Sequence, residues 1–167
     1  MSDAAPASEA DFLAVMAEVC TPVTVVTSLE RGLPYGTTVN AFTSLSLRPP
    51  MVLVALDQSS NLLDRLRRTR RFGVNILRSN QDALARRFAG RGGDKFRGVP
   101  WTEANGLPRL HDAIGWIACR ADAFVEGGDH ILVPGVVEQA VAVPGAPLAY
   151  HRRTFGTHSE SAGSPAR

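Results

Sequence analysis

A stretch of small, hydroxyl and amide side chains, residues 36–47, is the part of this sequence best suited to hold a ligand. It reads Gly-Thr-Thr-Val-Asn-Ala-Phe-Thr-Ser-Leu-Ser-Leu. Hydroxyl and amide groups, with the neighbouring backbone N–H groups, can bind phosphate oxygens and the polar edge of a planar ring. A solvent-facing strand uses the same residue types, because Thr and Ser are common there. The segment by itself leaves both interpretations open.

A second candidate is the sequence Gly127-Gly128-Asp129-His130. The paired glycines predict a tight hairpin turn. At the end of such a hairpin, His130 is either a turn residue or a ligand contact. His111 and His158 are interpreted as surface residues, and His151 is a minor pocket candidate beside Tyr150.

The strongest charge cluster comprises Arg65, Arg67, Arg68, Arg70 and Arg71. A solvated helix face is the favoured interpretation, because no aromatic residues are interleaved and acidic residues elsewhere balance the charge. Binding of nucleic acid is disfavoured for the same reason. A partial role in attracting anionic nucleotides is a third interpretation.

Most familiar catalytic motifs are missing from the sequence. The run from Gly90 to Lys95 resembles a phosphate loop, but its spacing fits neither the dinucleotide fingerprint nor the P-loop, and a helical segment precedes it. There is no Gly-x-Ser-x-Gly elbow and no His-x-x-x-His pair, so a metal site is not expected. A hydride-transfer enzyme fits this lack of acid–base groups, because its cofactors carry the difficult chemistry.

The elements that would position these residues are short. Helices are predicted over residues 9–19, 61–66 and 81–88, and strands over 23–28, 35–47, 51–56, 72–77, 113–125 and 131–143. Ser8 begins the first helix, whose face carries Phe12, Val15, Met16 and Val19. Asn61 is expected to cap the second, and residues 51–56 to be buried on both faces. Strict strand–helix alternation is absent, which favours an antiparallel barrel with helical insertions.

The 167 residues predict one domain over 8–158, with flexible termini at 1–7 and 159–167. A net charge of +2 gives no global attraction to nucleic acid or membrane. Cys20 and Cys119 are expected to be two buried free thiols in a reducing compartment. With no apolar stretch long enough to cross a bilayer, the prediction is a cytoplasmic protein.

The order of several segments resembles the short-chain flavin reductase family, the reductase components of two-component flavin-dependent monooxygenases. The segments that carry the resemblance are residues 22–27, 38–47, 49–54, 72–77, 87–90, 94–96, 127–130 and 147–150. The match covers roughly residues 12–155. The resemblance implies a mainly β fold with short helices, the FMN-binding split barrel of antiparallel Greek-key type, assembled as a homodimer.

The resemblance also implies a site. Residues 36–41 would line the isoalloxazine of FAD or FMN, with Asn40 at its polar edge, and Ser60-Asn61 would receive a phosphate at a helix start. His130, as the catalytic residue, would orient the nicotinamide of NADH or NADPH. The full set of implied flavin and nicotinamide contacts is Pro34, Tyr35, Gly36, Thr37, Thr38, Val39, Asn40, Ala41, Ser46, Ala55, Leu56, Asp57, Ser60, Asn61, Arg87, Phe88, Lys95, Phe96, His130 and Tyr150.

The expected activity is NAD(P)H-dependent reduction of FAD or FMN, with release of the reduced flavin to a separate monooxygenase. FAD is favoured over FMN because Arg87, Phe88 and Phe96 are suited to hold an adenylate. One alternative is a non-catalytic flavin-binding or carrier protein on the same barrel. Another is an oxidase or oxygenase of the related fold, which the short chain disfavours.

Overall fold

The structure of the protein is a computed structural model that describes residues 6–160. The predicted flexible termini, 1–7 and 159–167, lie largely outside these residues. The described helices are α1 (Glu9–Ala17), α2 (Asn61–Thr69) and α3 (Asp82–Ala89). The described strands are β1 (Thr21–Pro22), β2 (Thr24–Glu30), β3 (Leu33–Val39), β4 (Phe42–Leu47), β5 (Pro50–Asp57), β6 (Arg71–Ile76), β7 (Trp101–Ala104), β8 (Leu107–Leu110), β9 (Gly115–Ala121), β10 (Val125–Gly127), β11 (His130–Ala142), β12 (Leu148–His151) and β13 (Thr154–Thr157).

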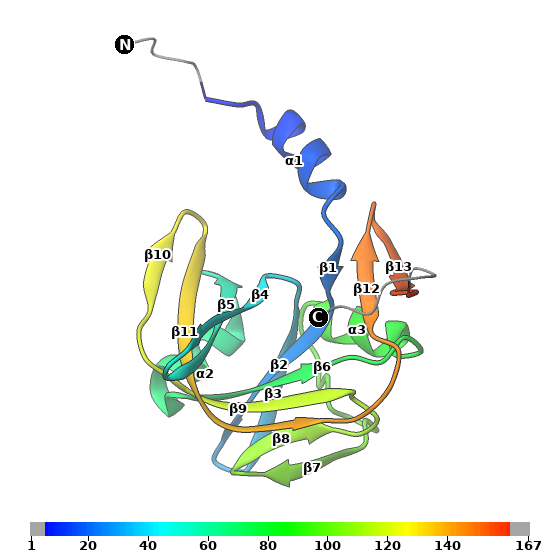
Figure 1. Ribbon diagram of the computed structural model, residues 1–167. Coiled ribbons are helices and arrows are strands. Elements are labelled where there is room, and N and C mark those ends of the chain that lie inside the picture. The colour runs from blue at the N-terminus through cyan, green and yellow to red at the C-terminus, as the bar shows by residue number, and fades with distance from the viewer. Residues whose placement is uncertain (1–5, 161–167) are drawn as a thin grey trace.

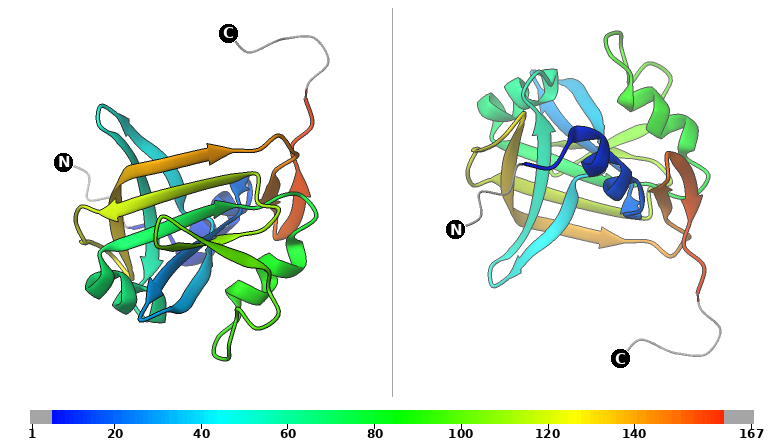
Figure 2. Two further views of the ribbon diagram at one scale, coloured as in Figure 1. Left: turned by 90° about the horizontal axis from the view of Figure 1, so that it is seen from below. Right: turned by 90° about the horizontal axis from the view of Figure 1, so that it is seen from above.

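The central feature is an antiparallel eight-stranded sheet in the order β3-β2-β6-β9-β11-β5-β4, with β10 paired to β11. Every strand pair in it is antiparallel, and the hairpin predicted at Gly127–Asp129 joins β10 to β11. Figures 1 and 2 show the sheet curling round on itself rather than lying flat. The mainly β class and the antiparallel barrel predicted from sequence are therefore confirmed.

The two edge strands of this sheet, β3 and β4, are consecutive in the chain. Only Asn40 and Ala41 separate them, and the Ala55 amide on β5 donates to the Ala41 carbonyl at 3.0 Å. The opposite edges of the sheet must therefore meet at this point. Beyond this junction β5 continues to Asp57, paired with β11, whereas β3 diverges from it, paired with β2. The barrel is therefore open between β3 and β5, and we call this opening the wedge.

Two apolar clusters stabilise this shape. One lies inside the barrel and joins the sheet to the inner face of α2, where Leu62, Leu63 and Leu66 are buried as predicted. The other packs α3 and the β12–β13 hairpin against the outside of β2. Figure 2 shows that hairpin beside α3, in line with the Arg86 guanidinium lying 4.8 Å from the centre of the Phe155 ring.

The β7–β8 hairpin had no predicted counterpart. The fully buried Asn75 holds it on the sheet, because its Oδ1 accepts from the Leu110 amide at 2.8 Å while its Nδ2 donates to the Val25 carbonyl at 3.2 Å. Thr27 also donates, to the Pro108 carbonyl at 2.8 Å. Buried polar groups must be paired in this way, and here the pairing specifies where the hairpin docks.

The helix predicted over residues 9–19 is present as α1, which ends at Ala17. Its apolar face is exposed, since Phe12 and Val15 remain 59% and 65% exposed and the helix projects away from the sheet (Figure 1). Two sequence expectations need correction. β5 alternates between buried and half-buried residues, because only one of its faces meets the barrel core. Cys119 is buried, but Cys20 lies exposed just after α1.

None of the helices in residues 6–160 has the length and apolarity needed to cross a membrane.

Gly36 on β3 allows α3 to approach the sheet closely. A Cβ at this position would lie 2.9 Å from Cε1 of the fully buried Phe88 and 3.2 Å from the Val26 carbonyl oxygen. We predict that Gly36→Ala lowers the free energy of unfolding by about 1–3 kcal/mol, the usual cost of overpacking. Urea denaturation followed by circular dichroism measures it. Gly156→Ala is the matched control, because nothing lies within 4 Å of its added Cβ. Equal stability of the two variants would contradict this role of Gly36.

Candidate binding pocket

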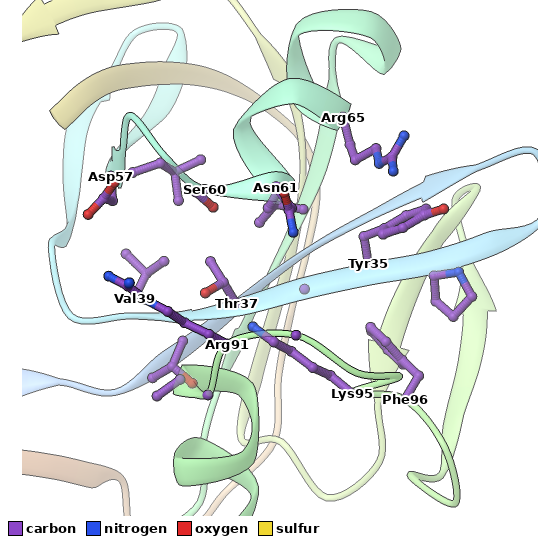
Figure 3. Close-up of a pocket in the computed structure, with 18 of the residues that line it drawn as sticks. Tyr35, Thr37, Val39, Asp57, Ser60, Asn61, Arg65, Arg91, Lys95 and Phe96 are labelled. Atoms are coloured by element: carbon purple, nitrogen blue, oxygen red, sulfur yellow. The ribbon is translucent and has the colours of Figure 1, made fainter.

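The wedge between β3 and β5 forms a pocket of about 1270 Å³. Its walls are β3 and the chain up to Ala41, the end of β5, the beginning of α2 and the loop that follows α3 (Figure 3). The structure thus brings most of the sequence-predicted site residues together around one cavity. They are Pro34, Tyr35, Gly36, Thr37, Thr38, Val39, Asn40, Ala41, Ala55, Leu56, Asp57, Ser60, Asn61, Lys95, Phe96 and His130.

β3 supplies one wall of the pocket as an edge strand. It pairs only with β2, so its outer edge presents unpaired backbone N–H and C=O groups toward the cavity. The hydroxyl of Thr38 donates to the Ala85 carbonyl at 2.6 Å, and that of Thr37 to the Phe88 carbonyl at 3.4 Å. A hydroxyl has a single proton to donate. These two side chains therefore fasten α3 to β3, and donors for an anion must come from elsewhere.

The N-terminus of α2 is one such source of donors. Asp57 turns the chain here, because its Oδ1 accepts from the Ser59 amide at 2.7 Å and the Ser59 hydroxyl at 2.6 Å, and these bonds lower the pKa of the carboxyl group. The N-cap residue is Ser60, not the predicted Asn61, and its side chain makes no capping bond. The uncapped first turn and the positive end of the helix dipole therefore lie at the pocket, whose lining includes Asn61 and Leu62.

The glycine-rich loop after α3 is the opposite wall. The spacing of residues 90–95 fits no known phosphate loop, yet Gly92 and Gly93 adopt positive φ and Arg91, Lys95 and Arg97 line the cavity. The Lys95 ammonium donates to the Phe88 carbonyl at 2.8 Å and has two further protons to offer. Partial burial lowers its pKa.

His130 lies at the same end of the pocket as Asp57, because the two residues are direct partners in the pairing of β11 with β5. Its Nδ1 lies 2.7 Å from Oδ1 of Asp129. A carboxylate only accepts, so Nδ1 is the donor in this contact, and Nε2 makes no hydrogen bond within residues 6–160. Attraction to His130 and Arg91 also contributes to the low pKa of Asp57.

Four predicted residues lie outside the pocket lining. Ser46 is on β4, where its hydroxyl accepts from the Arg48 amide at 3.2 Å. Arg87 points from α3 to the Arg97 carbonyl, and Tyr150 packs on Phe155 with their ring centres 5.2 Å apart. Phe88 is completely buried under Gly36, so it supports the wall without touching a ligand.

Arg65 lines the pocket, although the sequence predicts a solvated helix face for it. Tyr35 lies beneath it, and Glu30 pairs with both Arg65 and Arg68.

The pocket lining carries four cationic side chains, Arg65, Arg91, Lys95 and Arg97, against two carboxylates, Asp57 and Asp94. Such a balance favours an anionic ligand. Among residues 6–160 no group of three or more His, Cys, Asp or Glu side chains is arranged to hold a metal ion.

Comparison with known proteins defines the class. A model of the flavin reductase like domain matches residues 16–159. The reductase component of 4-nitrophenol 4-monooxygenase/4-nitrocatechol 2-monooxygenase from Rhodococcus opacus is 40% identical over 151 residues, which cover 90% of this chain and 82% of that protein. The NADH:riboflavin 5′-phosphate oxidoreductase of Streptomyces pristinaespiralis is 38% identical over 152 residues, with coverages of 87% and 86%.

A solved structure has the same fold as this chain. The NADH:FAD oxidoreductase of Streptomyces globisporus superposes with a TM-score of 0.87 at 30% identity, covering 96% of this chain and 99% of that one. The chain described here belongs to the flavin reductase like family, as its segment order had indicated.

If Lys95 contacts the phosphate of a bound flavin, its removal should weaken binding of phosphorylated flavins alone. Replacing it by Met should weaken binding of FMN about tenfold or more, the usual worth of a charge-assisted bond, and leave riboflavin, which has no phosphate, unchanged. Flavin fluorescence titration measures both. Equal losses for FMN and riboflavin would contradict a phosphate contact.

The same contact predicts a pH dependence. Only the protonated amine attracts phosphate, so FMN affinity should fall as pH rises through the Lys95 pKa, which burial places below the ordinary 10.5. Lys95→Arg, which stays charged, should remove this fall. Riboflavin titrated in parallel corrects for ionisation of the ring.

Proposed function

We propose that this protein uses NADH or NADPH to reduce FAD or FMN and releases the reduced flavin to a separate monooxygenase. The observation that carries the proposal is the open wedge between β3 and β5, whose backbone edge, helix N-terminus and cationic loop suit a flat ring with a phosphate arm. Family membership and the names of the relatives support the same reaction.

The residues present fit a flavin along β3. Backbone N–H groups left unpaired along residues 36–41 would donate to the polar edge of the ring, and Lys95 with the first turn of α2 would hold the phosphate. When bound, the flavin supplies the acceptor for a hydride from the nicotinamide. Edge N–H groups would also stabilise the negative charge that develops on the ring.

His130 would orient the nicotinamide at the Asp57 end of the pocket. Asp129 contacts Nδ1 of the imidazole at 2.7 Å, which would leave Nε2 to interact with the nicotinamide nucleotide. Holding both rings in a reactive geometry supplies most of the rate enhancement in this scheme. No side chain is required to remove a proton in this scheme.

Anaerobic mixing of the protein with flavin and NADH tests the proposal, because reduction bleaches the flavin absorbance. We predict that His130→Ala raises the KM for NADH about tenfold or more, the cost of a lost orienting hydrogen bond, with little change in flavin affinity. His158→Ala is the matched control, since His158 is exposed and outside the pocket lining.

Two outcomes would reject parts of this scheme. Tight flavin binding without bleaching by either nicotinamide would favour the alternative, a flavin-binding or carrier protein. Comparable losses of flavin binding and NADH use in His130→Ala would remove the role assigned to His130.

The protein is further proposed to act as a homodimer in the cytoplasm. The projecting α1 leaves Phe12, Leu13, Val15 and Met16 exposed along nine residues with no buried member, and an apolar surface of this kind favours association. The free thiols Cys20 and Cys119 suit a reducing compartment.

We predict that the protein sediments as a dimer and that Val15→Asp shifts it toward monomer. A monomeric wild-type protein at micromolar concentration would refute the dimer.

A further inference from the structure

The loop that follows α3, residues 90–98, is anchored at both ends and unsupported between them. At its start the Gly90 amide donates to carbonyl groups in the last turn of α3. Toward its end the buried Phe96 ring packs edge-on against Phe88, with the two ring centres 4.9 Å apart. Residues 91–94, between these anchors, are all exposed. This short segment therefore stands free of the core at one wall of the pocket.

Two glycines give the segment room to change direction. Gly92 and Gly93 have φ values of +73° and +69°, a region that glycine occupies without strain. A Cβ added at either position would meet nothing within 4 Å, so no neighbouring group restrains the backbone there. Movement of residues 91–94 would consequently break no core contact.

Arg91 and Asp57 carry opposite charges on opposite walls of the pocket. The Arg91 side chain extends from the loop across the pocket toward the side where Asp57 lies (Figure 3). Its guanidinium forms no hydrogen bond or ion pair within residues 6–160. Oδ2 of Asp57 is equally unused in this part of the chain, because both bonds from Ser59 go to Oδ1. The Ser59 bonds are the largest cause of the lowered pKa of Asp57, and attraction to His130 and Arg91 adds to it.

We propose that residues 91–94 form a lid, which closes over a bound flavin when the Arg91 guanidinium pairs with Oδ2 of Asp57. The proposal rests on the proposed function and adds to it a control of flavin release. A product that must leave after every turnover needs a closure that opens readily. An exposed ion pair shifts an equilibrium by only about two- to fivefold, so this lid would retain the flavin without trapping it.

The rival role for Arg91 is a direct contact with the ligand. A phosphate would be the partner of such a contact, and Asp57 would have no share in its effect. Riboflavin has no phosphate, so its binding kinetics separate the lid from a phosphate contact. Two substitutions that break the same ion pair do not add, whereas independent effects do. A double-mutant cycle with riboflavin therefore distinguishes the two roles.

Stopped-flow fluorescence of riboflavin binding without nicotinamide gives both rate constants, from the dependence of the observed rate on riboflavin concentration. We expect Arg91→Met and Asp57→Asn each to raise the dissociation rate constant about two- to fivefold, and the double variant to raise it no further. Asp57→Asn removes the charge and keeps an Oδ1 acceptor for Ser59. Arg67→Met is the matched control and should leave this constant unchanged, because Arg67 is an exposed cation of α2 outside the pocket lining.

Salt provides a second measurement on the same variants. Because salt screens an exposed ion pair, the wild-type dissociation rate constant should rise with ionic strength toward that of Arg91→Met, whose own constant should change little. If riboflavin binds too weakly for these rates, the same cycle is measured with FMN, and non-additivity of the two substitutions is then the deciding result.

Additive effects of the two substitutions, or a dissociation rate constant that neither of them changes, would overturn the lid. A rise seen with FMN but not with riboflavin in Arg91→Met would assign Arg91 to the phosphate and overturn it as well. The anaerobic bleaching assay is a separate result. The expected non-additive kinetics in a protein that never bleaches flavin would retain the lid and reject the reductase function, whereas normal bleaching with additive effects would do the reverse.

Discussion

The meeting of two sheet edges at Asn40 and Ala41 is the constraint on which the rest of this structure depends. β3 and β4 are one nearly continuous extended segment, yet they bound the sheet on opposite sides, and the Ala55 amide closes the junction through the Ala41 carbonyl at 3.0 Å. The sheet has to curl for both to be true. Because β5 continues past the junction while β3 turns away, closure at one end necessarily leaves an opening at the other.

That opening places groups of different chemistry face to face. β3 contributes an unpaired backbone edge, α2 its N-terminus and the loop after α3 its cations. The wall holds its position because Phe88 packs directly under Gly36 and the Thr38 hydroxyl is bonded to α3. Most polar side chains of β3 therefore serve the scaffold, and the electrostatic attraction for an anionic ligand comes from the helix end and the loop.

A pocket of this type suits chemistry that its ligands perform on each other. Two flat rings need to be held together and shielded, and charge that develops on one ring needs donors already in place. His130, whose Nδ1 contacts Asp129, and Arg65, which pairs with Glu30 and lies over the Tyr35 ring, lie toward opposite ends of one cavity.

The sequence by itself determined the strands and helices whose patterns are local. Alternating β-branched residues, the glycine turn before His130 and the leucines of α2 each act over a few neighbours, so the antiparallel barrel and most residues of its pocket were predictable, the latter through the family resemblance. Only the tertiary structure decided which face each residue meets. In the folded protein Phe88 is buried, Arg87 donates to the Arg97 carbonyl and the apolar face of α1 is exposed. Arg65 and the loop at 90–97 line the cavity. The reason is that contacts such as Arg65 with Glu30, or Asn75 with Leu110, join residues about 35 positions apart, and local periodicity contains no information about pairing at that distance.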